Sequence, residues 1–550
     1  MYMNTKRSEG AIESTNSYAR AILFISRLIC EMQVKLTKPS KYIIICLTMS
    51  EGGNDNSQQS AASLLSNELL ELCKSESLSA EELLEIIQRH GLTHDNPLSD
   101  YNFFLAACRN ENVTEEIIRC LLEYFPDATS ATDDEDGCLP LHFACYNKNV
   151  TLNIIQLIID AAPATVRSVT NHDSMPLHVL CRNHQLDEMT SIEILKLLIE
   201  KYPAAVRHAN NDGALPIHRA AGWKSAEICR VLIKAYPGSE RVTDVRGKLP
   251  LHWACYGSLQ TVEYLYRLYP DAIDTKTTDG YGVYPIHFVI SSTSKRDNPG
   301  AAVEVIQFLL NCDPNQKLIP LRGWSLLHIA CVRQYTDLNI EAGIQIVKIV
   351  FDAHPEAIED NQIGENIHRY HQRIQAFING ELVYARQAKD LRLMMTLDIN
   401  GQLPLHTALQ NNVRLGSIKL LVKGNPSALQ TVERNLAMPL HIACQYHDSA
   451  SVVKYLLSLS ATILDAVDRK GNTVLHYACR GSKHGTIALL LEKYDAASVS
   501  KRNTDGKLPI DLLWESNAVS DRESAEYTGS VFRLVRAYPE MVTISNLTRK

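Results

Sequence analysis

The sequence predicts an all-α solenoid of stacked helix-turn-helix units that are joined by β-turn fingers. Three observations support this fold class: a Pro-Leu-His phrase that recurs through most of the chain, a Gly five residues before the His in most copies, and a Pro after most of the long amphipathic runs. A unit of about 35 residues with one turn and two helices cannot bury its own apolar face, so the copies must stack into a continuous core.

The recurring phrase begins at Leu139-Pro-Leu-His142 and ends, altered, at Leu508-Pro-Ile-Asp511. Successive copies lie 34 to 41 residues apart when a weak copy at Ile367-His368 is included. A phrase that repeats in phase through most of a chain indicates a repeat architecture. The signature histidines are His142, His178, His218, His252, His287, His328, His406, His441 and His476.

Each copy predicts the same order of elements. A Gly such as Gly137 or Gly213 suits a tight turn with positive φ. The Pro then occupies the first turn of a short helix, where its missing N–H costs nothing. A longer amphipathic helix follows, for example over residues 194–202, and it ends at a Pro such as Pro203.

The phrase Gly-x-Leu-Pro-Leu-His-x-Ala-Cys resembles the Gly-x-Thr-Pro-Leu-His-x-Ala signature of the ankyrin repeat, over roughly residues 95–550. The resemblance implies that the signature His braces its turn by hydrogen bonding to the backbone. Leu replaces the family's Thr in most copies, with Thr473 retained, so the usual hydroxyl hydrogen bond is expected to be missing there. The period exceeds the family norm of about 33 residues, which predicts longer fingers.

Four segments follow from this pattern. Residues 1–60 are expected to be a disordered leader, or a mis-assigned one if translation begins at Met49. Capping helices are expected at 61–94, where Ser79-x-x-Glu82 forms a capping box. Repeats follow at 95–514, about 11 to 12 units that become degenerate near 360–395. A C-terminal capping helix is expected at 515–550.

Composition excludes several function classes. The chain has 55 Lys and Arg residues against 62 Asp and Glu, a net charge of −7, so nucleic acid and anionic membranes are not expected partners. No apolar stretch approaches the 18 to 20 or so residues of a spanning helix, so membrane insertion is not expected. We expect a monomer that resides in the cytoplasm or the nucleus.

Cysteine and histidine recur in phase, which argues against metal and redox chemistry. Equivalent positions on stacked helices lie about 8 to 10 Å apart, too far for a disulfide and too far for ligands to converge on one zinc ion. The cysteines are therefore expected to be small buried hydrophobes and the chain to bind no cofactor. The equivalent cysteines are Cys108, Cys145, Cys181, Cys255, Cys331, Cys444 and Cys479.

The chain carries no catalytic motif of the phosphate-loop, zincin, paired-cysteine or nucleophile-elbow type, so no enzyme activity is expected. The resemblance implies a protein-protein interaction scaffold or adaptor that binds a protein or peptide on its concave surface. A regulatory or inhibitory subunit of an enzyme is the alternative, and a catalytic group hidden near residues 360–395 is a weaker one.

Candidate partner-binding residues follow from the positions that vary within the family. These aromatic side chains lie near the ends of first helices or in turns, and we expect them outside the core between units. Packing against a neighbouring unit is the alternative role for each of them. The candidates are Tyr146, Trp223, Tyr256, Tyr281, Trp324 and Tyr446.

Overall fold

A computed structural model of the chain describes residues 56–90, 101–293, 298–313, 321, 323–398, 400–459, 464–494, 496–516 and 524–539. The chain divides into two compact units, Met1–Ala61 and Ala62–Lys550, and the first is described only where α2 begins. Most of the leader predicted for residues 1–60, the alternative start at Met49 and the end of the predicted C-terminal cap lie outside the described residues.

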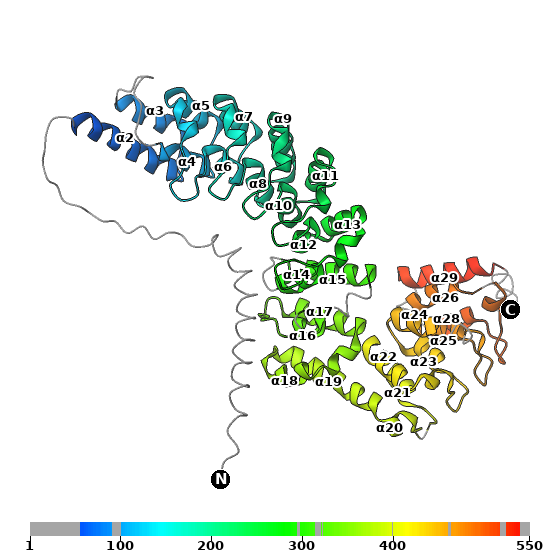
Figure 1. Ribbon diagram of the computed structural model, residues 1–550. Helices are drawn as coiled ribbons and strands as arrows, with labels where there is room; N and C mark the ends of the chain where they lie inside the picture. Colours follow the sequence, from blue (N-terminus) through cyan, green and yellow to red (C-terminus); the bar gives the residue numbers. More distant parts are fainter. Residues whose placement is uncertain are drawn as a thin grey trace, which may run out of the picture. The chain divides into compact units, whose positions relative to one another are not determined.

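The described residues form helices, and their only β pairing is a single bridge between Leu321 and Trp324. Most helices occur in pairs, a first helix followed by a second (Figure 1). The first helices are α2 (Asn56–Lys74), α4 (Asn102–Arg109), α6 (Pro140–Tyr146), α8 (Pro176–Arg182), α10 (Pro216–Trp223), α12 (Pro250–Ala254), α14 (Pro285–Ser292), α16 (Leu326–Cys331), α21 (Pro404–Gln410), α23 (Pro439–Tyr446), α25 (Val474–Arg480) and α28 (Pro509–Ser516). The second helices are α3 (Ala80–Arg89), α5 (Glu115–Tyr124), α7 (Leu152–Ala161), α9 (Glu188–Lys201), α11 (Ala226–Ala235), α13 (Leu259–Leu268), α15 (Gly300–Cys312), α17 (Ile340–Ala353), α22 (Leu415–Gly424), α24 (Ala450–Leu459), α26 (His484–Leu491) and α29 (Ala525–Ala537).

The units stack through like contacts. α6 packs against both α4 and α8, and α7 packs against both α5 and α9. Apolar side chains of the first helices, such as Leu141 and Cys145, are buried between the two series. One hydrophobic cluster extends across the C-terminal units from Met394 to Leu534. The predicted all-α solenoid is therefore confirmed.

The first helices begin as the sequence predicts. Pro is the first residue of α6, and Leu139 before it is extended and makes no side-chain cap. Where a hydroxyl is present it does cap the helix: Thr473 accepts from the N–H of His476 (3.4 Å), and Ser325 accepts from that of His328 (3.2 Å). The hydroxyl bond is thus confined to the units that retain Ser or Thr.

The longer period does not produce longer fingers, which corrects the expectation from the sequence. The Pro after six of the second helices ends that helix and opens a 3-10 helix, since it lacks the N–H but suits the first turn. Ala205 in this turn is buried against the stack. The extra residues therefore form a packed turn. These turns are η2 (Pro126–Ser130), η3 (Pro163–Arg167), η4 (Pro203–Arg207), η6 (Pro270–Asp274), η9 (Pro355–Glu359) and η11 (Pro426–Gln430).

The array is interrupted after α17, and the weak copy at Ile367-His368 is not a repeat. These residues lie in the short turn η10 (Ile367–Arg369), and the His368 side chain is exposed. The segment also forms α18 (Asn361–Asn366), α19 (Gln372–Lys389) and α20 (Leu391–Met395). α19 packs along α22, while α17 contacts α22 directly. The series of second helices therefore continues past the insertion.

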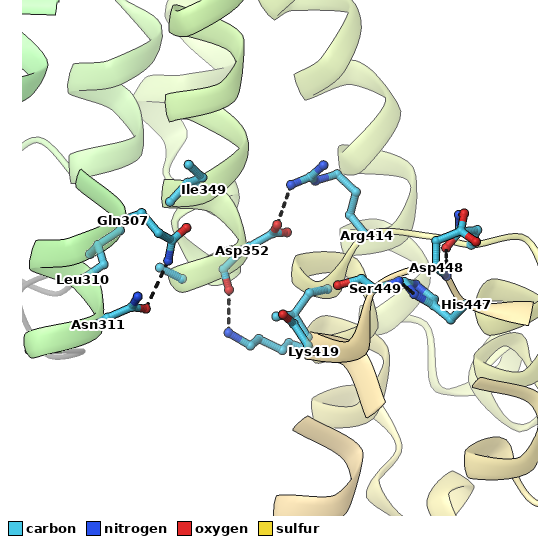
Figure 2. A pocket seen from close by; sticks show the side chains of 14 residues that line it. Gln307, Leu310, Asn311, Ile349, Asp352, Arg414, Lys419, His447, Asp448 and Ser449 are labelled. Atoms are coloured by element: carbon cyan, nitrogen blue, oxygen red, sulfur yellow. Dashed lines mark hydrogen bonds and ion pairs between the residues drawn. The ribbon is translucent and has the colours of Figure 1, made fainter. Parts of the chain in front are cut away.

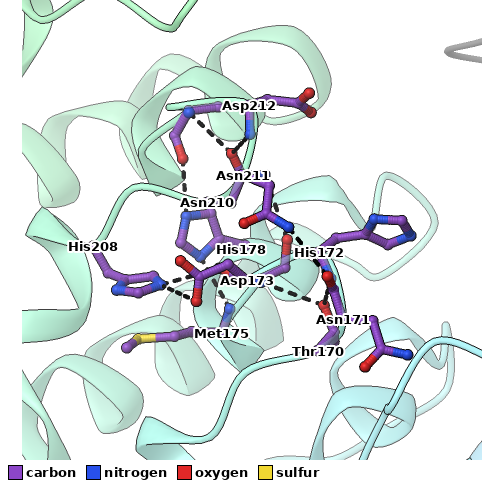
Figure 3. A network of polar contacts seen from close by, with 12 residues as sticks. Thr170, Asn171, His172, Asp173, Met175, His178, His208, Asn210, Asn211 and Asp212 are labelled. Carbon is purple, nitrogen blue, oxygen red and sulfur yellow. Dashed lines mark hydrogen bonds and ion pairs between the residues drawn. The ribbon is translucent and has the colours of Figure 1, made fainter.

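The fingers depend on one residue with positive φ. Gly takes this position in most fingers, but Asp173 (φ 57°) and Leu436 (φ 60°) take it in two. The carbonyl before this residue accepts a backbone N–H from the next finger; Figure 3 shows Asn211 donating to His172 (3.1 Å). Main-chain hydrogen bonds thus join successive fingers. The same bond runs from Asn171 to Asp136, from Val245 to Asp212, from Thr278 to Arg246, from Arg469 to Asn435 and from Thr504 to Lys470.

Replacing Gly213 with Ala is expected to destabilise the stack by about 2 to 3 kcal/mol, because the positive φ disfavours an L side chain and a new clash is added. A Cβ there would lie 2.8 Å from Val245 N of the next finger. Gly506→Ala is the matched control, since φ is also positive but no atom lies within 4 Å of the Cβ position. Equal losses in urea unfolding would show that the fingers are not in tight contact.

Candidate partner-binding surface

The signature histidine makes two backbone hydrogen bonds in most units. In His142, Nδ1 accepts the N–H of Leu139 (3.1 Å), the residue before Pro. A neutral ring then carries its proton on Nε2, which donates to the carbonyl of Ser174 in the next finger (3.1 Å). The ring thereby caps its own helix and joins it to the neighbouring unit. The acceptors of the other Nε2 atoms are Ala214 for His178, Val242 for His218, Thr431 for His406, Ala466 for His441 and Lys507 for His476.

His287 also accepts the N–H of the residue before Pro, Tyr284 (3.2 Å). Three units depart from the pattern, those of His252, His328 and Asp511. His252 keeps the Nδ1 bond, to the N–H of Leu249 (3.1 Å), but its Nε2 has no partner among the described residues. In the last unit, Asp511 replaces His and its carboxylate accepts the N–H of Leu508 (2.8 Å), but a carboxylate has no proton to donate to a further finger.

His328 makes neither bond within the described part of the chain. Both ring nitrogens are buried without a partner, and the Ser325 hydroxyl caps the helix instead. The ring lies against Trp324, with centroids 4.6 Å apart, and against Tyr370 of the insertion. The next finger is replaced by α18, so no equivalent carbonyl follows. No hydrogen bond of the described residues therefore supports the bracing role that the resemblance implies for His328.

Burial keeps these imidazoles neutral. Loss of hydration lowers the pKa to about 4 at His142 and His218, and to about 3 at His178 and His252, from an ordinary 6.5. Protonation would also add a hydrogen to Nδ1, which could then no longer accept the hydrogen bond from the backbone N–H. The rings therefore act as uncharged connectors.

The cysteines of the described residues are free thiols, most of them buried. Burial raises the pKa of Cys73 and Cys181 to about 12, so both remain protonated and unreactive at neutral pH. Among the residues that the structure describes, no three His, Cys, Asp or Glu side chains are grouped so that they could hold a metal ion.

An Asp or Asn that the sequence analysis missed organises many of the fingers. Asp244 Oδ1 accepts the N–H groups of Arg246 and Lys248, both at 2.9 Å. Asn210 does the same for Asp212 and Ala214 (Figure 3). The signal was present in the sequence as an Asp or Asn three residues before the turn Gly.

A buried asparagine series joins the N-terminal units and was also missed. Asn147 Nδ2 donates to the carbonyls of Cys108 (3.1 Å) and Asn110 (2.7 Å) in the preceding unit. Asn110 and Asn183 repeat this arrangement. Because Asn110 bonds to the end of α2, that helix belongs to the first-helix series.

Two of the aromatic candidates are exposed at helix ends. Tyr146 is the last residue of α6 and 45 % of its surface is accessible, while Tyr446 is the last residue of α23 with 40 % accessible. Both side chains are therefore available to a partner. They belong to units far apart in the array.

Trp223 and Tyr256 are half-buried against neighbouring units. The Trp223 ring lies 5.4 Å from that of His184 in the preceding unit. The Tyr256 ring meets the edge of Phe288 in the following unit, with centroids 5.8 Å apart. The expectation that these side chains lie outside the core between units is therefore wrong for this pair, because their rings contact side chains of the adjacent unit.

Tyr281 and Trp324 lie in turns, and both are half-buried. The N–H of Tyr281 donates to Asp279 Oδ1 (3.1 Å) within its finger. Trp324 forms the β bridge with Leu321, and its ring covers His328. The six candidates occupy six different units and do not converge on one point.

An aromatic column directly after the signature histidine was missed. Trp253 is buried, and its Nε1 donates to Asp244 Oδ2 (3.3 Å) in the finger of its own unit. Tyr477 donates in the same way to Asp468 (2.9 Å). These contacts fasten the fingers to the first helices. The column contains Phe143, Trp253, Phe288 and Tyr477.

A cavity of about 510 Å³ lies where α17 meets α22, beside the insertion (Figure 2). Arg414 pairs with Asp352 (2.5 Å), and the carbonyl of Asp352 accepts from Lys419. Asp448 pairs with Lys483 (2.6 Å). Because the charged side chains of its lining already have partners within the protein, we interpret this cavity as a joint in the stack.

His218→Ala is expected to cost about 1 kcal/mol more in free energy of unfolding than His252→Ala. Both rings are fully buried and accept a backbone N–H, but Nε2 of His218 alone of the two donates to a carbonyl. Urea unfolding measures the difference. An equal or larger loss for His252→Ala would remove the bridging role assigned to Nε2.

Lowering the pH from about 7 to 5 is expected to destabilise the stack. In the unfolded chain the histidines have a pKa of 6.5 and bind protons below that pH. In the folded chain His142 and His218 stay neutral down to about pH 4. The free energy of unfolding should therefore fall by up to about 1.4 kcal/mol per pH unit for each such ring. A urea midpoint that is unchanged over this range would contradict neutral buried imidazoles.

A family profile described as ankyrin repeats (3 copies) matches residues 177–279 and 405–503. Both segments contain the stacked helix pairs, bridging histidines and bonded fingers described above. A search of curated proteins finds no match. Ankyrin repeats are generally protein-protein interaction modules and are typically non-catalytic. The matched segments are ankyrin repeats, and the repeated helix units of the other described residues are consistent with an ankyrin-repeat protein.

Proposed function

We propose that this protein is a non-enzymatic scaffold or adaptor that binds a protein or peptide partner through the ends of its first helices. The observation that carries the proposal is the exposure of Tyr146 and Tyr446, each the last residue of a first helix. An exposed Tyr at a fixed helix end offers apolar area and a hydroxyl with few rotatable bonds.

The rigidity of the scaffold supports the same proposal. The signature imidazoles join the N-terminal ends of the first helices to the next finger, and main-chain hydrogen bonds join the fingers to one another. Such a surface needs little further ordering when a partner binds, so less of the interaction energy is lost to conformational entropy.

Location and assembly remain predictions. No helix in the described ranges combines the length and apolar character that crossing a bilayer requires. Buried protonated thiols suit a reducing compartment, and we propose the cytoplasm or the nucleus, with the protein as a monomer.

A Tyr146→Ala/Tyr446→Ala variant is expected to bind its partner with about a hundredfold or more lower affinity. Aromatic anchors that become buried in an interface each contribute roughly 2 kcal/mol or more to binding. The measurement is affinity capture from cell lysate with quantitative mass spectrometry. Phe532→Ala is the matched control, since it removes an exposed aromatic side chain from α29, a second helix.

Proteins captured by wild type and Phe532→Ala but lost by the double variant would support the proposal. An enzyme among them, whose activity changes on binding, would assign the regulatory role. If the folded double variant captures the same proteins as wild type, the helix-one ends are not the binding surface.

A further inference from the structure

Exposed aliphatic side chains recur on three consecutive fingers of the C-terminal units. Leu397, Val432 and Val467 follow one another at intervals of 35 residues and are 53, 37 and 38 % accessible. Large aliphatic side chains in equivalent exposed positions form a continuous apolar strip when their units stack. Further exposed apolar side chains close to these residues in the sequence are Leu393, Met395 and Leu436.

The fingers that carry this strip are in direct contact. The N–H of Arg434 donates to Asn400 O (3.4 Å), and the N–H of Arg469 donates to Asn435 O (2.8 Å). Equivalent side chains on neighbouring fingers therefore lie about one unit spacing apart, 8 to 10 Å for packed helices. We call Leu397, Val432 and Val467, together with the basic residues Arg434, Arg469 and Lys470, the C-terminal finger strip.

Basic side chains lie next to the aliphatic ones. Arg434 follows Val432 after one buried residue, Arg469 follows Val467 in the same way, and Lys470 is adjacent. All three basic side chains are exposed, and none makes an ion pair among the described residues. No salt bridge within the described part of the chain therefore holds these three cations.

The acidic residues of these fingers do not neutralise the cations. Asp468 Oδ1 accepts the N–H groups of Lys470 and Asn472, both at 2.8 Å, and its other oxygen accepts from Tyr477. Glu433 is buried and accepts the N–H of Asn435 (3.1 Å). Both carboxylates are buried in the turn, so the exposed charges that directly follow Val432 and Val467 are the three cations. The exposed carboxylates of these segments are Asp398, which follows Leu397 and accepts the N–H groups of Asn400 (2.8 Å) and Gln402 (2.7 Å), and Asp465. The positive charge of the strip therefore lies on its second and third fingers.

The first finger has the opposite charge. Its exposed tip is Asp134, Glu135 and Asp136, and Asp133 beside them pairs with Arg109 (3.3 Å). An anionic ligand is repelled there and attracted at the other end of the array. The charge pattern therefore selects both the sign of the ligand and the fingers that it contacts.

We propose that the C-terminal finger strip binds an extended acidic segment of a partner protein, with an apolar side chain at about every third residue. A chain in the extended polyproline II conformation has three residues per turn and advances about 3.1 Å per residue, so every third side chain lies on one face and three residues match the spacing of one finger. The apolar side chains cover Leu397, Val432 and Val467 while carboxylates between them pair with the cations. This inference deepens the proposed function and rests on it.

The apolar strip favours a peptide over a nucleic acid. Phosphates could pair with Arg434, Arg469 and Lys470, but a nucleic acid backbone has no aliphatic side chains to cover the strip. An acidic peptide satisfies both the charge and the apolar area. Nucleic acid binding is accordingly an outcome of the test that would overturn the proposal.

The test uses the full chain and a fluorescein-labelled synthetic peptide of about twelve residues with the repeat Leu-Glu-Asp. Fluorescence anisotropy should show saturable binding that weakens as salt is raised. Ser-Glu-Asp and Leu-Lys-Lys repeats of equal length should bind at least about tenfold more weakly, because each lacks one of the two required features.

Variants then locate the site. Arg434→Glu/Arg469→Glu/Lys470→Glu should weaken binding of the acidic peptide by about tenfold or more. Val432→Ser/Val467→Ser should weaken it several-fold without changing its dependence on salt. The control for charge is Lys196→Glu/Lys234→Glu/Arg533→Glu, which makes the same change in net charge on exposed second-helix positions of α9, α11 and α29 and should bind as wild type does.

The proposal is overturned if the acidic peptide does not bind, if the finger variant binds it as tightly as wild type, or if the Ser-Glu-Asp peptide binds equally well. Tighter binding of a single-stranded oligonucleotide of equal charge would also overturn it. If any of these overturning results occurs while capture of cellular proteins still depends on Tyr146 and Tyr446, the finger strip is not a binding site. The proposed function at the ends of the first helices is then still supported.

Discussion

The stack depends on a neutral imidazole that is buried between two units. Nδ1 accepts a hydrogen bond from the start of its own helix and Nε2 donates one to the next finger, as His218 does with Leu215 (3.0 Å) and Val242 (3.1 Å). A helix pair of this size cannot bury its apolar face alone, so each unit is stable only on its neighbours. The bridge sets the register of that contact, because both partners are backbone groups whose positions are determined locally.

The architecture changes after α16, where the signature His makes neither of the two hydrogen bonds. After α16 the ring nitrogens of His328 have no partner among the described residues, and the following helix pair is replaced by α18 to α20. Second-helix contacts bypass the insertion through Asp352, which accepts from Arg414 and from the N–H of Gly416 (2.9 Å). Glu381 of α19 is buried beside this joint and accepts from the Ser417 hydroxyl. A polar joint thus replaces the imidazole bridge at this one place.

The fingers separate structural residues from exposed ones. Asp244 and Asp468 are residue types that often occur in binding sites, but here their oxygens accept hydrogen bonds from the turn and from the first helix. The side chains on either side of them are exposed and vary in character along the array, from acidic in the first finger to aliphatic and basic in the last ones. A constant scaffold therefore carries a variable surface, which is the property that an interaction module requires.

The sequence by itself determined the features that arise from spacing within one unit. The turn Gly, the Pro at the helix start, the stop at the second Pro and the signature His all follow from local backbone requirements, and the structure places helices and turns accordingly. The Ser79 cap of α3 belongs to the same class, since its hydroxyl accepts the N–H of Glu82 three residues later (3.2 Å).

Only the tertiary structure decided the features that depend on residues about 35 positions apart. It decided that Tyr146 is exposed while Tyr256 meets Phe288, that His252 Nε2 makes no hydrogen bond to the described residues, and that Leu436 adopts the positive φ of a missing Gly. Neighbouring units impose these outcomes through packing and through the position of a carbonyl on the next finger. A spacing pattern records which residues recur, but the exposure of each one is set by the unit stacked beside it.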